Sequence, residues 1–306
     1  MCSISSTGLP LANSEFFGTY DLEKEGAMRA IPAVFAILIL VLAWGSQGYS
    51  QIWNREVIDN AGDVGYNSRI AVTSDGTPYV LYIADGVVRL AWRMPSADGG
   101  GGWNSTFVGT NVYPDYRSIA MCIDADDDVH IAFASYGAWY DLYLLRYSVF
   151  DSETKDWQLP VENVPEQTPY PFFPDIAVID SGEAITPIIV YVKDGPSDSL
   201  KCATRDPVSG AWSLSVIYDQ HPVGHQVSIA VDSHLGLHVS FYEETGLDLM
   251  YAKKPAGSSV WSCSYVDIAA DVGIHSSIIV DSEDRPHIVY YDRTTRDLKY
   301  AKLISE

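Results

Sequence analysis

The stretch RPHIVYYDRTTRDLKYAKLISE, Arg285 to Glu306, decides the fold because it repeats an earlier stretch, GLHVSFYEETGLDLMYAKKP, Gly236 to Pro255. Each copy holds two short runs of alternating apolar and polar residues around a turn-rich loop, which is typical of two half-buried strands. The earlier copy continues into VWSCSYV, a further alternating run that opens with a tryptophan. The later copy stops before such a run. The sequence is therefore a repeat whose last copy lacks a strand.

Tryptophans mark the repeat length, because one of them opens an alternating run every 49 to 55 residues. After each such run come a loop and three further runs, which in the last repeat read SIIV, PHIVYY and LKYA. Four short strands in a period of this length predict the blade of a β-propeller. The tryptophans are Trp53, Trp103, Trp157, Trp212 and Trp261.

The order of strands explains the missing one. We expect the run of the SIIV type to be innermost and the tryptophan run to be outermost in each blade. The fifth repeat has Ser277–Val280, Pro286–Tyr291 and Leu298–Ala301, and the outer strand left over is Trp53–Ile58. Because an open strand edge is prone to aggregate, pairing these ends is favourable. We predict an all-β, five-bladed propeller of four-stranded blades, closed by Trp53–Ile58 on the C-terminal blade.

The first fifty residues differ from the repeats. Residues 28–50 read MRAIPAVFAILILVLAWGSQGYS, with one arginine, a short apolar run and a small polar exit, as in a secretory signal peptide. Residues 1–27 are acidic and predict an upstream extension outside the native fold, and 51–306 form the propeller. An uncleaved N-terminal anchor is the alternative. We expect a secreted, periplasmic or cell-surface protein.

Composition excludes several partners. The chain has 40 Asp and Glu against 19 Lys and Arg, a formal charge of −21, and shows no basic cluster. Nucleic acid and anionic membranes both require a positive footprint, so we expect neither as a partner after signal cleavage. Cys122, Cys202 and Cys263 follow the leader without CxxC spacing, and therefore predict neither a disulfide framework nor a zinc site.

The phrase PHIVYYD…DLKYA and its copies resemble repeats of secreted bacterial and archaeal β-propellers of the sialidase-like and lectin-like kind. The resemblance covers Trp53 to Glu306 and implies architecture and extracellular ligand recognition. The sequence departs from the sialidases themselves, which carry the Asp-box motif SxDxGxTW. Its nearest string to that motif is TSDGTPY, Thr73–Tyr79. That string lies between a first and a second strand and lacks the tryptophan. The sialidase arginine triad has no clear counterpart either: Arg69 and Arg117 are candidates for two of its members, and no third is placed.

Residues leading into the innermost strands, with the loops between second and third strands, should surround one mouth of the central channel. Propeller ligands usually bind there, which is an analogy at the level of the fold. A sugar needs aromatic rings for its C–H face and polar groups for its hydroxyls. We therefore predict non-catalytic recognition of an extracellular glycan or similar surface ligand, although each side chain alone is also explained by packing at a wet rim. The predicted ligand-binding residues are Tyr66, Asn67, Arg69, Tyr116, Arg117, Phe173, His225, Gln226, His275 and Trp139.

Two other functions stay open. A glycoside hydrolase or polysaccharide lyase would use a pair of carboxylates, for which Asp175, Glu243 and Asp292 are the candidates. A protein-interaction scaffold would instead show a flat apolar patch. An enzyme predicts a deep pocket with at least two close acids, whereas a binder predicts aromatic rings around the mouth.

Metal and cofactor motifs are weak. Asp124, Asp126 and Asp128 alternate in DADDD as calcium ligands do, but the loop lacks the glycine and the distal glutamate of such sites. We expect a polar hairpin turn there and no cofactor, with calcium as the one candidate. A histidine recurs at the start of the second strand in three repeats, and we predict that it hydrogen-bonds to the adjoining turn rather than binding a metal. The three are His130, His238 and His287.

Overall fold

The computed structural model describes residues 54–94, 101–110, 112, 118–137, 142–168, 172–193 and 199–304. Within these ranges every regular element is a β-strand, which confirms the all-β prediction. The described residues include no helix able to cross a membrane. The predicted upstream extension and signal segment lie outside the described residues. The strands are β1 (Val64–Val72), β2 (Pro78–Ala84), β3 (Val87–Arg93), β4 (Trp103–Thr110), β5 (Ile119–Ile123), β6 (Val129–Gly137), β7 (Leu142–Asp151), β8 (Asp156–Thr168), β9 (Phe172–Asp180), β10 (Ile185–Lys193), β11 (Ser199–Arg205), β12 (Trp212–Tyr218), β13 (Val223–Val231), β14 (Leu237–Glu243), β15 (Asp248–Lys254), β16 (Ser262–Asp267), β17 (Val272–Val280), β18 (Pro286–Asp292) and β19 (Asp297–Lys302).

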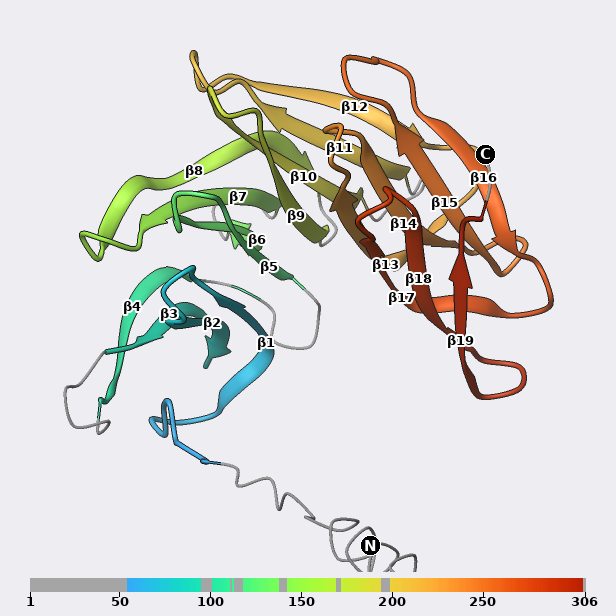
Figure 1. Ribbon diagram of the computed structural model, residues 1–306. Coiled ribbons are helices and arrows are strands. Elements are labelled where there is room, and N and C mark those ends of the chain that lie inside the picture. Colours follow the sequence, from blue (N-terminus) through green and yellow to red (C-terminus); the bar gives the residue numbers. More distant parts are fainter. Residues whose placement is uncertain are drawn as a thin grey trace, which may run out of the picture. The chain divides into compact units, whose positions relative to one another are not determined.

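These strands form five antiparallel sheets in chain order, each strand paired with the next along the chain (Figure 1). Four sheets have four strands, β1–β4, β5–β8, β9–β12 and β13–β16, and the fifth has three, β17–β19. Short turns join the strands, as expected for hairpin meanders. The repeat period and the order of strands within it are therefore as predicted.

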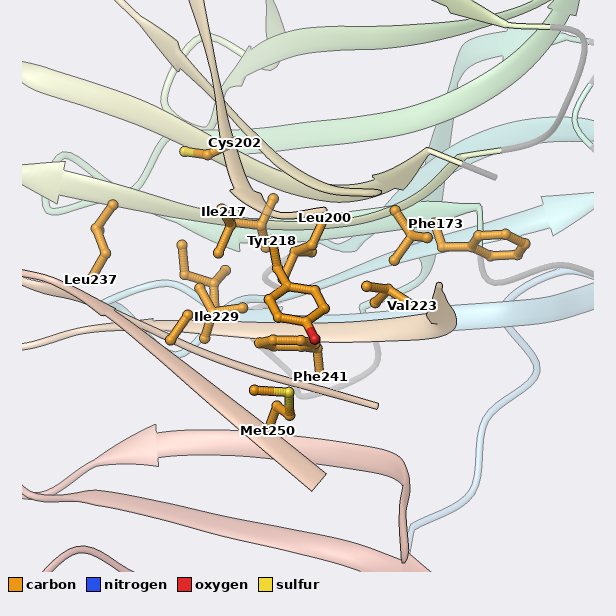
Figure 2. Packing of buried hydrophobic residues seen from close by; sticks show 14 of the residues in the cluster. Phe173, Leu200, Cys202, Ile217, Tyr218, Val223, Ile229, Leu237, Phe241 and Met250 are labelled. Atoms are coloured by element: carbon orange, nitrogen blue, oxygen red, sulfur yellow. The ribbon is translucent and has the colours of Figure 1, made fainter. Parts of the chain in front are cut away.

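Successive sheets pack face to face, with β1 against β5, β5 against β9, β9 against β13 and β13 against β17. An apolar cluster fills each of these four seams. Figure 2 shows the seam between the third and fourth sheets, where Ile217 and Tyr218 of β12 meet Phe241 of β14 and Met250 of β15. The core is thus a series of layers between sheets. The second, third and fourth sheets each contribute to two layers, and the first and fifth sheets each contribute to one.

The predicted tryptophans of the outer strands contribute to these seams. Trp212 of the third sheet packs edge-on against Tyr147 of the second, with ring centroids 5.2 Å apart. Its indole N–H donates to Glu162 of β8 at 2.8 Å, and the same carboxylate accepts from Arg205 at 2.8 Å. Trp157 and Trp261 pack against the clusters of the first and third seams. Each outer strand therefore fastens its sheet to the preceding one.

The predicted closing strand is not observed. Asn54–Ile58 carries no strand, and β19 pairs only with β18 among the described strands. Trp53 lies outside the described residues. Glu56 nevertheless contacts the first sheet, because it accepts hydrogen bonds from Arg93 at 2.8 Å and from the indole N–H of Trp103 at 2.9 Å. The fifth sheet keeps an open edge in this structure.

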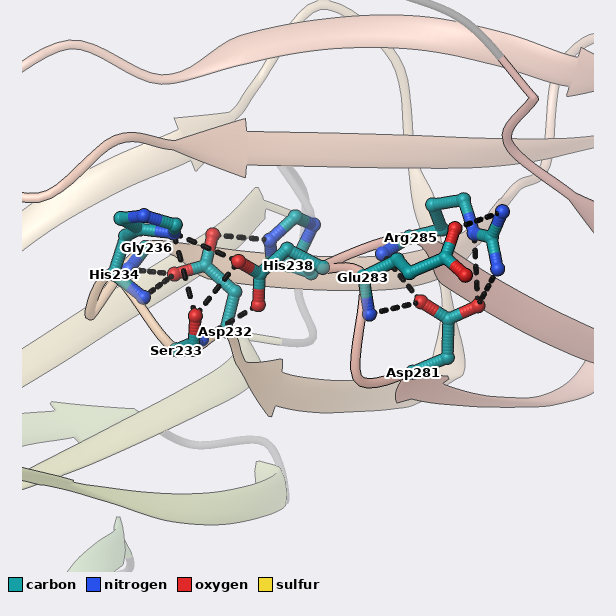
Figure 3. Close-up of polar contacts among 9 residues, drawn as sticks. Asp232, Ser233, His234, Gly236, His238, Asp281, Glu283 and Arg285 are labelled. Carbon is teal, nitrogen blue, oxygen red and sulfur yellow. Dashed lines mark hydrogen bonds and ion pairs between the residues drawn. The ribbon is translucent and has the colours of Figure 1, made fainter.

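The three repeated histidines are structural, as predicted. In the second, fourth and fifth sheets the imidazole bridges a tyrosine hydroxyl, 2.6 Å from Nδ1, and an aspartate of the adjoining turn, 2.8–2.9 Å from Nε2. Figure 3 shows the fourth-sheet example, where His238 reaches Asp232. Burial alone would raise the pKa of Asp232, but His238 and the amides of Gly236 and His234 together lower it. The triads are Asp124–His130–Tyr147, Asp232–His238–Tyr251 and Asp281–His287–Tyr300.

Replacing His238 with leucine should destabilise the protein by about 3 kcal/mol, because it removes the buried hydrogen bonds of the imidazole to Oδ2 of Asp232 and to the hydroxyl of Tyr251. The His238 side chain is 0% exposed, whereas that of His287 is 20% exposed. Urea denaturation of both variants measures the difference.

His287→Leu is the matched control and should lose less than about 1 kcal/mol, since its triad is partly solvated. Asp281 there also keeps ion pairs with Arg285 at 2.8 Å and Lys302 at 3.2 Å. Equal losses in the two variants would contradict the role assigned to burial.

Candidate functional site

A polar pocket of about 240 Å³ lies where the innermost strands of four sheets meet. β1, β9, β13 and β17 each contribute to its wall. Typical ligand pockets measure roughly 300–1,000 Å³, so this one holds a single small polar unit rather than a long chain. It is lined by Arg69, Phe173, Pro174, Asp175, Gln226, Val227, Ser228, Ser276 and Ser277.

Irregular pairing at the start of the innermost strands aims these side chains. The ladders of β1, β13 and β17 with their neighbours shift register just before the pocket residues, and bulges of this kind redirect side chains. In β17 the bulge includes Gly273, whose φ is +102°. A Cβ there would stand 2.7 Å from the Cα of Leu249, so only glycine fits.

Asp175 is the acid of the pocket. It is half-buried, open to the pocket and enclosed by protein on its other sides. Its Oδ2 accepts from the amide of Ile229 at 3.0 Å. Burial raises the pKa of Asp175, and the backbone hydrogen bonds and the charge of Arg69 offset this only in part. A carboxyl group with a raised pKa in a pocket is a functional-site candidate.

Gln226 and Arg69 complete the polar wall. The Oε1 atom of Gln226 is buried and finds no hydrogen-bond partner among the described residues. An unpaired buried acceptor costs about 1–3 kcal/mol, so a ligand or solvent donor at this point is favourable. The guanidinium of Arg69 donates to the carbonyl of Ser68 at 3.2 Å and faces the same pocket.

Four residues predicted from the sequence meet in this pocket: Arg69, Phe173 and Gln226 from the ligand-binding set, and Asp175 from the carboxylate set. Sequence reasoning did not single out Ser228 or Ser277. The signal was present, because both stand at the repeat position of Arg69 and Asp175, directly before the Ile-Ala or Ile-Ile of the innermost strand.

The other described residues of the predicted ligand-binding set, Tyr66, Asn67 and His275, do not line this pocket. Tyr66 is 44% exposed on β1, and Asn67 occupies the bulge of the same strand with a φ of +50°. His275 lines a neighbouring hollow beside Tyr291 and Arg293. Tyr116, Arg117, Trp139 and the side chain of His225 fall outside what the structure describes.

Glu243 and Asp292 have local roles in their own turns and do not line the central pocket. Glu243 accepts from the amides of Thr245 at 2.8 Å and Gly246 at 2.7 Å. Asp292 accepts from the amides of Thr294 and Thr295, both at 2.9 Å, and is 3.1 Å from Lys299. Hydrogen bonding from Thr295 leads the effects that lower the pKa of Asp292.

The predicted calcium candidates also serve a turn. Oδ1 of Asp124 accepts from the amides of Asp126 at 3.0 Å and Asp128 at 2.8 Å, while Oδ2 accepts from His130. Among the described residues, a different group has potential metal-ligand atoms within 4.8 Å of one another. It consists of Asp232, His234 and Asp284. There Ser233 and His234 already hydrogen-bond to Asp284 (Figure 3 shows Ser233 and His234). Both groups are therefore occupied in holding turns.

Comparison with known proteins identifies the architecture. No family model and no curated protein matches the sequence. The fucose-recognising lectin of Aleuria aurantia, a six-bladed β-propeller, matches with a TM-score of 0.54 and 16% identity over 79% of this chain and 77% of the lectin. A Penicillium chrysogenum α-L-arabinanase, solved with arabinobiose, matches with a TM-score of 0.51 and 6% identity over 78% and 80%. A protein of unknown function from Dyadobacter fermentans matches with a TM-score of 0.54 and 9% identity over 78% of each chain. The fold is therefore that of a β-propeller.

Replacing Asp175 with asparagine should raise the melting temperature at pH 8 more than at pH 4. Because the pKa of the folded state lies above that of the unfolded chain, ionisation destabilises the fold. This penalty is present at pH values above the folded-state pKa and vanishes below the unfolded value of about 4. Calorimetry at both pH values measures the difference.

Asp180→Asn, at the exposed end of the same strand, is the control and should melt like the wild type at both pH values. A uniform loss of stability in Asp175→Asn at the two pH values would show that the carboxylate only holds the backbone.

Proposed function

We propose that this protein is an exported β-propeller that binds a carbohydrate in its central pocket and does not turn it over. The observation that carries the proposal is the buried Oε1 of Gln226, which has no hydrogen-bond partner among the described residues, in a pocket that also holds Asp175 and Arg69. A sugar hydroxyl both donates and accepts hydrogen bonds, so adjacent hydroxyls pair with an amide oxygen, a carboxylate and a guanidinium. Phe173 also lines the pocket, but its side chain is 3% exposed and packs in the apolar cluster of the third seam, so the polar groups carry the recognition.

The similar structures support a saccharide ligand. The Aleuria aurantia lectin recognises fucose, and the arabinanase was solved with arabinobiose. Both proteins are described with a sugar ligand, and both are similar in fold to this chain. Fold alone does not give function, and the support comes from combining the fold with the polar pocket.

The enzymatic alternative is less favoured. Glycoside hydrolysis uses two carboxylates about 5–10 Å apart, and Asp175 is the one carboxylate among the described residues of the pocket wall. Glu243 and Asp292 bind the backbone of their own turns. A binding role needs one acid only.

The scaffold alternative would use exposed apolar side chains. Ile279, Leu298 and Tyr300 of the fifth sheet are 66%, 82% and 59% exposed. We assign this surface to closure of the propeller rather than to a partner.

We further propose that the propeller has five blades and that Trp53–Ile58 forms the missing outer strand of the fifth. In the second sheet Glu162 lies opposite Tyr147 and reaches forward to an arginine and a tryptophan of the third sheet. Glu56 makes the same pair of contacts with Arg93 and Trp103 of the first sheet. Glu56 therefore contacts the first sheet in the same way as an outer-strand glutamate of a preceding blade would.

A groove of about 320 Å³ between the fourth and fifth sheets supports this placement. Tyr251 and Tyr265 of the fourth sheet and Ile288 and Ala301 of the fifth line it. At the equivalent seam between the second and third sheets, Trp212 packs on Tyr147, the counterpart of Tyr251. Trp53 is the outer-strand tryptophan without an assigned seam, so we place its ring in this groove.

The proposed export rests on a different feature, the apolar run that precedes Trp53 and resembles a signal peptide.

The proposed register is set by the complete sheets. In the first, third and fourth sheets the third residue after the tryptophan lies opposite a fixed position of the third strand, as Ser215 lies opposite Cys202 and Ser264 opposite Tyr251. In the second sheet the register is shifted, and the fifth residue, Glu162, lies opposite that position. Applied to the fifth sheet, the register of the first, third and fourth sheets places Glu56 opposite Tyr300 and Arg55 opposite Ala301.

A glycan array probed with the protein from Gln51 onward should show saccharide binding that falls at least tenfold in Gln226→Leu and Asp175→Asn, since each loses a buried hydrogen bond worth about 1–3 kcal/mol. Asp180→Asn should bind like the wild type.

Release of new reducing ends from a bound glycan would overturn the non-catalytic proposal. Absence of binding to every saccharide would overturn the carbohydrate assignment.

Cysteines introduced at Arg55 and Ala301 in a Cys263→Ser background should form an intramolecular disulfide on mild oxidation, because the proposed register places these residues opposite each other. Peptide mapping by mass spectrometry detects the bond. Arg55→Cys with Lys302→Cys is the control and should not cross-link, since a shift of one residue turns the side chain to the other face of the sheet.

A bond formed between two molecules would assign the open edge to a second copy of the chain. Failure of the 55–301 pair to cross-link would refute closure by this segment.

A further inference from the structure

A second hollow, of about 510 Å³, adjoins the central pocket along the chain. It is lined by Ile274 and His275, which directly precede the pocket residues Ser276 and Ser277 on β17. Its remaining lining is Tyr291, Arg293 and Arg296, from the end of β18 and the β18–β19 turn. The hollow therefore combines one aromatic ring, one imidazole and two guanidinium groups.

Two arginines in one hollow are a local exception to the acidic character of the chain, whose formal charge is −21. The Arg296 side chain makes no hydrogen bond or ion pair with any residue the structure describes. Arg293 lies 3.6 Å from Asp271, against 2.8 Å for the Arg93–Glu56 pair. Neither side chain is held in a close ion pair, so both guanidinium groups have donors for an anion.

The turn does not need these arginines to form. Asp292 caps it through the amides of Thr294 and Thr295, and Arg296 contributes its own amide to the carbonyl of Asp292 at 2.8 Å. The φ of Arg296 is +65°, a conformation in which glycine is preferred. The side chain of Arg296 is thus not required by the backbone and occupies a position better suited to glycine.

The matching turn of the fourth sheet has the same construction without the two arginines. Glu243 caps it through Thr245 and Gly246, and Leu247 has a φ of +63° at the position of Arg296. Glu244 stands at the position of Arg293. The two arginines therefore distinguish the turn of the fifth sheet from that of the fourth.

We propose that Arg293 and Arg296, with His275 and Tyr291, form a subsite for the carboxylate of a uronic acid, so that the ligand is an acidic saccharide. The inference rests on the proposed function, because the neighbouring sugar unit would occupy the central pocket. Arginine pairs with a carboxylate through two parallel hydrogen bonds, and a tyrosine ring stacks on the C–H face of a sugar.

Titration calorimetry tests the proposal with trimers of glucuronate, galacturonate and mannuronate, each paired with its carboxyl-reduced neutral form. At least one acidic trimer should bind about tenfold or more tightly than its reduced form, which is the effect of one charge-assisted hydrogen-bond pair. The preference should weaken with added salt. A tri-glutamate peptide is the test for an acidic protein ligand.

Arg296→Gly separates binding from structure. It should lose the preference for the acidic trimer while melting at or above the wild-type temperature, since glycine suits the left-handed position. Leu247→Gly in the fourth sheet is the matched control and should gain stability with the preference unchanged. Arg293→Gln should also lose the preference, whereas Arg285→Gln, which removes the same charge from the turn between β17 and β18, should keep it.

The subsite is refuted if no acidic trimer exceeds its reduced form or if the preference survives in Arg296→Gly. Tight binding of tri-glutamate instead of the uronates would overturn the saccharide assignment of the hollow. Binding of neutral trimers that is lost in Gln226→Leu would leave the proposed function intact while refuting the subsite.

Discussion

Burial of each sheet against the next is the constraint on which the rest of the structure depends. A single antiparallel sheet of four short strands has two faces, and both are largely apolar here. Each seam therefore holds its own apolar cluster, such as the one that joins Ile217 and Tyr218 to Phe241. At about 25 cal/mol per Å² of apolar surface removed from water, these seams supply the main favourable free energy of folding. Outer-strand tryptophans and the Glu162–Trp212 contact fasten one sheet to the following one.

This stacking brings the innermost strands together and creates the central pocket. Equivalent residues of the innermost strands lie side by side. One repeat position therefore supplies four residues of the pocket wall from four of the sheets: Arg69, Asp175, Ser228 and Ser277. Asp175 and Ser228 at that position also accept hydrogen bonds from the amides of Ile229 and Ile278 in the next sheet, so one repeat position serves both the pocket and the contact between sheets. A repeat fold can acquire a binding site by substitution at a few inner positions, while its apolar pattern stays constant.

The turns and the pocket carry different polar chemistry. In the turns between first and second strands, aspartates bind backbone amides and histidines, and every oxygen of Asp232 is engaged. In the pocket, the acceptor of Gln226 has no partner among the described residues, and Asp175 keeps a raised pKa because it is buried. Satisfied polar groups stabilise a fold, whereas unsatisfied ones at a concave surface are what a ligand can pair with.

The sequence by itself determined the strands, their order and the repeat, because alternation with period two and the regular spacing of tryptophans are local properties of the chain. It also predicted that Arg69, Phe173, Asp175 and Gln226 lie where the chain enters the innermost strands, and these four line the pocket. The same argument selected Tyr66 and His275, which do not line it, because the bulges that redirect side chains are not visible in the sequence. Only the tertiary structure decided that Glu243 and Asp292 cap their own turns, because an acid beside a turn looks the same in sequence whether it faces the backbone or a ligand. The tertiary structure also decided that Ser228 and Ser277 join the pocket and that Arg293 and Arg296 share one hollow. Those juxtapositions depend on how separate sheets pack, and packing across a seam leaves no periodic trace in the sequence.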